Sequence, residues 1–135
     1  MCMENLKVIK GNFDEYIKWN GLRLAEDEFG LNIKNGKTDY YVVLDGDKFF
    51  SEFFVFVDNM EVNLNITGRF PEIYKVMLEA LKENYDVLTF TSDEETYNNF
   101  VYIKELVEII SEDKDVFELQ DNRVFTLNKM TCRIK

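Results

Sequence analysis

Histidine is absent from this chain of 135 residues, and proline and cysteine are scarce, with one proline and two cysteines. Without histidine, the chain cannot form a Ser-His-Asp or Cys-His nucleophile arrangement, and it lacks the imidazole ligands of the usual zinc sites. Cys2 and Cys132 lie near opposite ends and do not form the dense disulfide framework of small secreted proteins. The missing histidine excludes many common enzymes, and the scarce cysteines indicate that the protein is located in a reducing cytoplasm.

Long apolar runs are also missing. No window approaches the roughly 20 apolar residues that cross a bilayer, and the segment from Met1 to Lys7 has no apolar run of signal-peptide length. We therefore expect a cytoplasmic protein that does not enter a membrane.

Basic residues are few relative to acidic ones, with 16 Lys and Arg against 26 Asp and Glu, a formal charge of -10. Such a charge repels nucleic acid phosphates and attracts basic surfaces. It predicts no direct nucleic acid binding and a basic protein partner, although acidic surfaces also serve solubility alone.

Aromatic residues are abundant, with twelve Phe and seven Tyr in a chain that is 46% hydrophobic. Large rings bury much apolar area, and this length is typical of one domain with its own core. We therefore expect residues 1–135 to form a single domain.

The first half of the sequence predicts a strand from Leu6, a helical region capped by Asn12, and a loop from Gly30 to Lys37. Two apolar runs, 39–45 and 48–57, flank Asp45-Gly46-Asp47, a strong signal for a tight hairpin.

The second half begins with an alternating strand over Glu61 to Thr67, which places Val62 and Leu64 on one face. Pro71 opens an amphipathic helix, and a strand follows over 86–91. A second helix is expected after Ser92 or Asp93, with its apolar stripe at Phe100, Ile103, Val107 and Ile110. The polar run 111–115 ends that helix, and 116–119 and 123–130 form a closing hairpin.

The order is therefore strand, helical region, three strands, helix, strand, helix and two strands. It predicts an α+β fold, a central mixed sheet with helices on both faces. The strands before Pro71 and after Tyr85 are joined by a helix, so we expect them to be parallel.

This order resembles the GNAT family of acyl-coenzyme A-dependent N-acetyltransferases, most clearly from Glu61 to Leu106. The resemblance implies a cleft between the two parallel strands for acetyl-CoA. It also implies a cofactor-binding set of Ile66, Thr67, Gly68, Arg69 and Asn98. The family's phosphate loop carries more glycine, whereas this loop has Phe70 and Pro71, which add bulk and remove an amide donor. We therefore expect a degenerate phosphate loop.

The resemblance further implies Glu61 as a catalytic base toward an amine and Tyr102 as an acid for the departing thiolate. Three functions stay open: a catalytically degenerate, acidic accessory or inhibitory protein of the phage or mobile-element type, an active N-acetyltransferase with acetyl-CoA, and a homodimer paired through a sheet edge.

Overall fold

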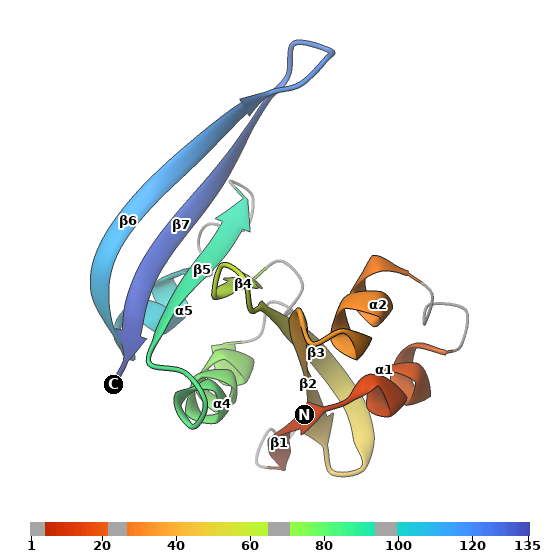
Figure 1. Ribbon diagram of the computed structural model, residues 1–135. Coiled ribbons are helices and arrows are strands. Elements are labelled where there is room, and N and C mark those ends of the chain that lie inside the picture. Colours follow the sequence, from red (N-terminus) through yellow and green to blue (C-terminus); the bar gives the residue numbers. More distant parts are fainter. Residues whose placement is uncertain (1–4, 22–26, 65–70, 94–99) are drawn as a thin grey trace.

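The computed structural model of the chain describes residues 5–21, 27–64, 71–93 and 100–135. Within these ranges one mixed sheet runs in the order β1-β2-β3-β4-β5-β7-β6 (Figure 1). Its strands are β1 (Leu6–Gly11), β2 (Thr38–Asp45), β3 (Lys48–Phe56), β4 (Glu61–Asn63), β5 (Val87–Asp93), β6 (Val107–Glu118) and β7 (Val124–Ile134). The helices of these ranges are α1 (Phe13–Asn20), α2 (Glu28–Lys34), α4 (Pro71–Lys82) and α5 (Val101–Lys104). None of these helices is long and apolar enough to cross a bilayer.

The hairpin expected at Asp45-Gly46-Asp47 is confirmed. Strands β2 and β3 are antiparallel, with Asp45 opposite Lys48. Gly46 has a φ of 62°, a conformation that glycine adopts without steric cost. Strand β3 lies between β2 and β4, and its Phe53, Phe54 and Val55 are buried.

Helix α1 begins where the sequence predicted. The Asn12 side chain accepts a hydrogen bond of 3.0 Å from the Glu15 backbone N–H and so caps the helix. The Tyr16 ring packs edge-on against the Tyr40 ring, and Phe54 completes the contact from β3. This small cluster covers one face of β2 and β3.

The loop predicted from Gly30 to Lys37 is wrong over most of its length, because α2 runs through Gly30 to Lys34. Asp27 caps this helix, accepting from the Gly30 backbone N–H at 2.7 Å. The Phe29 ring stacks on Phe54 with centroids 4.7 Å apart. Burial of the apolar side of α2 therefore outweighs the turn-forming preference of its Gly and Asn residues.

A partly buried polar contact joins α1 to the sheet. The Tyr40 hydroxyl donates to the Glu52 carboxylate at 2.7 Å, and the Asn20 amide donates to the same oxygen at 2.9 Å. Burial and the hydrogen bond to Glu52 raise the pKa of Tyr40 above its ordinary value. Tyr40 is fully buried, so its hydroxyl depends on Glu52 as a partner.

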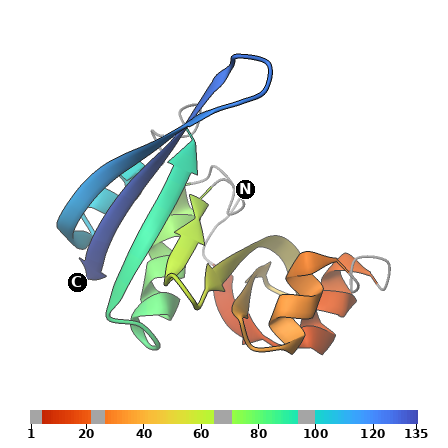
Figure 2. The same ribbon diagram turned by 45° about the horizontal axis from the view of Figure 1, so that its top comes forward.

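The larger core lies on the opposite face of the sheet, under α4 (Figure 2). The predicted helix from Pro71 is confirmed, and Ile73, Met77 and Leu81 of its apolar stripe are each at most 1% exposed. They pack with Leu88 and Phe90 of β5 in one cluster. Helices thus cover both faces of the sheet, as the sequence predicted.

The second predicted helix is wrong in its extent. Ser92 and Asp93, the expected caps, lie in β5, and α5 ends at Lys104. Val107 to Glu118, which includes the polar run 111–115, is strand β6. The run Val-Glu-Ile-Ile suits a strand as well as a helix, and pairing with β7 satisfies its backbone groups.

The closing hairpin is confirmed but is longer than predicted. Strands β6 and β7 pair from Val107 opposite Ile134 to Glu118 opposite Val124. Asn122 has a φ of 65° in the turn, a conformation that Asn tolerates better than most residues. Beyond the last residue of β5, Asp93, the hairpin extends away from the rest of the sheet (Figure 1).

Candidate functional site

The centre of the sheet is the parallel pair β4 and β5, which confirms the predicted orientation. Glu61 lies opposite Thr89, and Asn63 lies opposite Thr91. Among the described residues this pairing ends there, because Leu64 is already helical, while β5 continues to Asp93 beside β7. The predicted strand over Glu61 to Thr67 is therefore confirmed for Glu61–Asn63 and wrong at Leu64, and its last residues, 65–67, lie outside the described ranges.

Alternation along these strands separates an apolar face from a polar one. Val62, Phe90 and Met130 are fully buried in the core beneath the helices. Their sequence neighbours Glu61, Thr89 and Lys129 therefore point to the other face, since successive side chains of a strand alternate. Polar side chains thus meet on one face of β4, β5 and β7.

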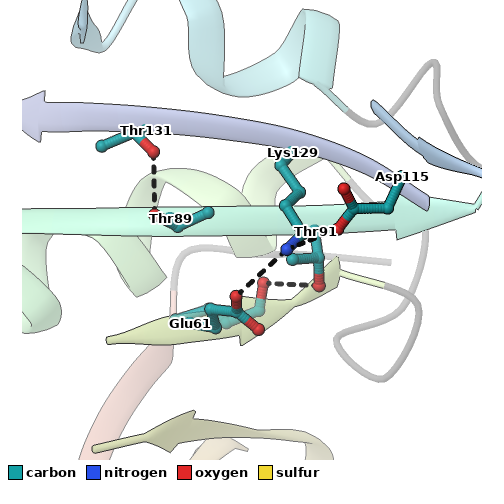
Figure 3. A network of polar contacts seen from close by, with 7 residues as sticks. Glu61, Thr89, Thr91, Asp115, Lys129 and Thr131 are labelled. Carbon is teal, nitrogen blue, oxygen red and sulfur yellow. Dashed lines mark hydrogen bonds and ion pairs between the residues drawn. The ribbon is translucent and has the colours of Figure 1, made fainter. Parts of the chain in front are cut away.

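Lys129 lies at the centre of this polar face, between two carboxylates (Figure 3). Its Nζ is 3.7 Å from Glu61 Oε1 and 2.7 Å from Asp115 Oδ2. The hydrogen bond to Asp115, with a further contribution from Glu61, raises the pKa of Lys129 above its ordinary value. The side chains of Glu61 and Lys129 are only 25% and 29% exposed, so solvent screens this pair less than a fully exposed one.

Threonine hydroxyls extend the network along β5. The Thr89 and Thr131 hydroxyl oxygens are 2.9 Å apart and form a cross-strand hydrogen bond. The Thr91 hydroxyl donates to the Val62 backbone oxygen over 3.5 Å. These contacts join β4, β5 and β7 through side chains as well as through the backbone (Figure 3).

Glu61 is the one predicted site residue whose side chain lies in the described part of the chain. Its carboxylate faces the polar side of the sheet, as a base toward an amine would require, but it contacts Lys129. Tyr102 lies in α5, and its side chain is outside what the structure describes. The remaining predicted residues, Ile66, Thr67, Gly68, Arg69 and Asn98, lie in 65–70 and 94–99, outside the described ranges.

Sequence reasoning missed Lys129, Asp115 and Thr131 as members of the site. Their alternation in the closing hairpin was visible, since Lys129 and Thr131 are two residues apart. What the sequence did not reveal was that β7 inserts between β5 and β6 and so carries Lys129 next to Glu61.

The fit of acetyl-CoA can be judged at the start of α4. A helix N-terminus binds a pyrophosphate through backbone N–H groups, but α4 begins at Pro71, which has no N–H. Gly68 is the single glycine between Glu61 and Lys82. The sequence therefore provides one position at which the absence of a side chain would let the backbone come close to a pyrophosphate. By sequence, Pro71 removes one N–H donor and the single glycine restricts the backbone, which disfavours the cofactor, and no reaction step is assigned to it.

No protein-family model matches the sequence, and no curated protein matches it. Solved structures do match. A GNAT-family acetyltransferase from Bacillus cereus ATCC 10987 has a TM-score of 0.60 at 11% identity, over 96% of this chain and 99% of that one. A spermidine N-acetyltransferase chimera from Vibrio cholerae and hSSAT has a TM-score of 0.62 at 12% identity, over 96% of each chain.

A ribosomal-protein-S5-alanine acetyltransferase from Vibrio fischeri has a TM-score of 0.55 at 12% identity, over 99% of this chain and 95% of that one. At such identities the likeness concerns the fold. It extends over nearly the whole of both chains. The chain therefore has the fold of the GNAT acetyltransferases.

Proposed function

We propose that this protein uses the GNAT fold without catalysis, as an acidic protein that binds a basic protein partner. The observation that carries the proposal is the contact between Glu61 and Lys129, whose charged atoms are 3.7 Å apart. A general base must reach the amine that it deprotonates. Here an ammonium group of the chain itself lies beside the expected base.

Asp115 strengthens this argument. It holds Lys129 Nζ at 2.7 Å, so the ammonium group is anchored from the side opposite Glu61. A substrate amine would have to displace a cation with two carboxylate partners. The poor fit of the α4 N-terminus to a pyrophosphate supports the same conclusion.

The binding role is supported by charge. With a formal charge of -10, the protein attracts basic surfaces at long range. Such a protein can compete for the basic surface of a nucleic-acid-binding enzyme, which is the accessory or inhibitory role expected of a phage or mobile-element protein. The free, buried thiol of Cys132 is compatible with the reducing cytoplasm that we propose as its location.

Mass spectrometry after incubation with acetyl-CoA and amines tests the absence of catalysis. Spermidine and a peptide with a free N-terminal alanine are suitable acceptors, because two structural neighbours are named for such substrates. We expect no acetylated product from the wild-type chain. Time-dependent product that Glu61→Gln abolishes would overturn the proposal.

An active N-acetyltransferase is the second candidate, and one observation favours it. The pairing of β4 and β5 ends at Asn63 and Thr91 within the described residues, while β5 continues to Asp93. Diverging strands at this position are what the family resemblance requires for its cofactor. For this candidate, Glu61→Gln should lower turnover while leaving the unfolding midpoint close to that of the wild type, since Glu61 is partly exposed.

A further inference from the structure

Strand β6 forms one outer edge of the sheet and is the longest strand that the structure describes, with 12 residues. Its inner side pairs with β7, so alternate backbone N–H and C=O groups point outward along its free side. Natural proteins protect such an edge or use it to pair with another chain.

The end of this edge is apolar on both faces. Val116 is 65% exposed and Phe117 is 47% exposed, and on β7 Val124 and Phe125 are 64% and 40% exposed. Phe117 and Phe125 lie opposite each other with ring centroids 6.2 Å apart. Neighbouring apolar side chains exposed on both strands indicate a binding surface rather than isolated surface residues.

Two carboxylates lie on either side of Val116 and Phe117 along β6. Asp113 and Glu118 are exposed, and neither forms an ion pair with the residues that the structure describes. The other acidic residues of this stretch differ, because Glu112 pairs with Lys104 at 3.2 Å and Asp115 pairs with Lys129. Asp113 and Glu118 are therefore available to a cationic partner.

Two registers in which a second copy of this chain could pair with this edge bring like charges together. In an antiparallel pair of β6 strands, setting Val116 opposite Phe117 of the second copy places Asp115 opposite Glu118. Centring the pair between Asp115 and Val116 instead places Asp113 opposite Glu118. Like charges directly opposite one another destabilise a strand pair, so these two registers are disfavoured, whereas a basic strand can meet both Asp113 and Glu118 with opposite charge.

We propose that residues 113–118 of β6 bind an extended segment of a basic protein as an added strand. This inference rests on the binding role proposed above and specifies its surface. Main-chain hydrogen bonds give affinity in such complexes, and alternate side chains give specificity.

Alternation along β6 also specifies the pattern of the added strand. Asp113 and Phe117 share one face, and Val116 and Glu118 share the other. The added strand should therefore carry Lys or Arg opposite Asp113 and Glu118, with two adjacent apolar residues opposite Val116 and Phe117. Each of its faces then presents one cation and one apolar side chain.

A synthetic 12-residue peptide with Lys-Val-Val-Thr-Thr-Lys at its centre, read antiparallel to β6, is the probe. Fluorescence anisotropy with the full chain should show saturable binding that weakens with added salt. Replacing both peptide lysines by Glu should weaken binding by about tenfold or more. The double variant Asp113→Lys with Glu118→Lys should reverse this preference and bind the Glu peptide better.

A matched control carries Asp47→Lys with Glu83→Lys, which gives the same net charge from exposed residues outside β6. Reversal by the β6 variant alone supports the proposal. Equal behaviour of the two variants, or no binding of either peptide, overturns it. Light scattering that shows a dimer, dissociated by Val116→Thr, also overturns it in favour of a second copy. None of these outcomes depends on acetyl transfer, so the inference and the absence of catalysis fail separately.

Discussion

Lys129 and Glu61, 68 residues apart in the chain, face each other across β5 with 3.7 Å between Nζ and Oε1. Strand β5 contributes the threonines between them, and Asp115 of β6 holds the same ammonium group. The contact therefore ties β4 to the closing hairpin on the polar face of the sheet.

Lys129→Met should change the free energy of unfolding by less than about 1 kcal/mol, because partly exposed ion pairs contribute little. The methionine keeps most of the apolar stem of Lys129, which lies opposite Thr91 in the pairing of β5 with β7. Urea denaturation of both proteins measures the difference. A loss of several kcal/mol would mean that the ion pairs of Lys129 contribute strongly to folding, which would contradict this expectation.

The small stabilisation from Lys129 should depend on pH in one direction. The folded-state pKa of Lys129 is raised by Asp115 and Glu61, so the stabilisation is fully present below the ordinary lysine pKa of about 10.4. It is lost as pH rises through the folded-state pKa. Wild type and Lys129→Met should therefore differ at pH 8 and converge at higher pH, as measured by urea midpoints. A difference that grows with pH would contradict this assignment.

Phe90→Ala should destabilise the protein by about 3–5 kcal/mol, because it leaves a cavity under α4. Phe90 is fully buried in the main cluster with Leu88 and Met77. Ile110→Ala is the control, since Ile110 is 52% exposed on β6 and should cost no more than about 0.5 kcal/mol. Similar losses for both variants would place the core elsewhere.

Glu52→Ala should cost about 1–3 kcal/mol, since it removes the carboxylate that accepts from the fully buried Tyr40 hydroxyl. Combining it with Tyr40→Phe removes both partners and should recover part of the loss. A double-mutant cycle by urea denaturation measures this coupling. Additive effects would show that the hydrogen bond between Tyr40 and Glu52 contributes nothing to stability.

The thiol of Cys132 should not react with a disulfide reagent in the folded protein. The side chain is fully buried in the core, and burial raises its pKa to about 12, so the reactive thiolate is rare at neutral pH. A Cys2→Ser variant isolates this thiol. We expect its rate of modification to rise steeply only as urea unfolds the chain. Fast modification without denaturant would contradict the buried position.

Local signals were sufficient for several elements. Asp45-Gly46-Asp47 predicted the β2–β3 hairpin, because a glycine at positive φ suits the tight turn. Pro71 with the stripe after it predicted α4, and the α4 crossover predicted the parallel pairing of β4 and β5. The turn and the helix are signalled by neighbouring residues, and in this fold no tertiary contact overrides either signal.

Other elements depend on distant contacts. Val107 and Ile110 fit the spacing of a helix, but the pairing of 107–118 with β7 makes the segment a strand. Glu61 was predicted from the family resemblance, whereas its neighbour Lys129 follows only from the strand order. The sequence therefore did not reveal that Lys129 lies beside Glu61.

Isothermal titration calorimetry of the full chain with acetyl-CoA at millimolar concentration tests the absence of a productive cofactor site most directly. Pro71 at the start of α4 predicts no saturable heat, and the Lys129 contact of Glu61 predicts no acetyl transfer. Saturable binding with a micromolar Kd, accompanied by acetyl transfer to an added amine, would contradict the account.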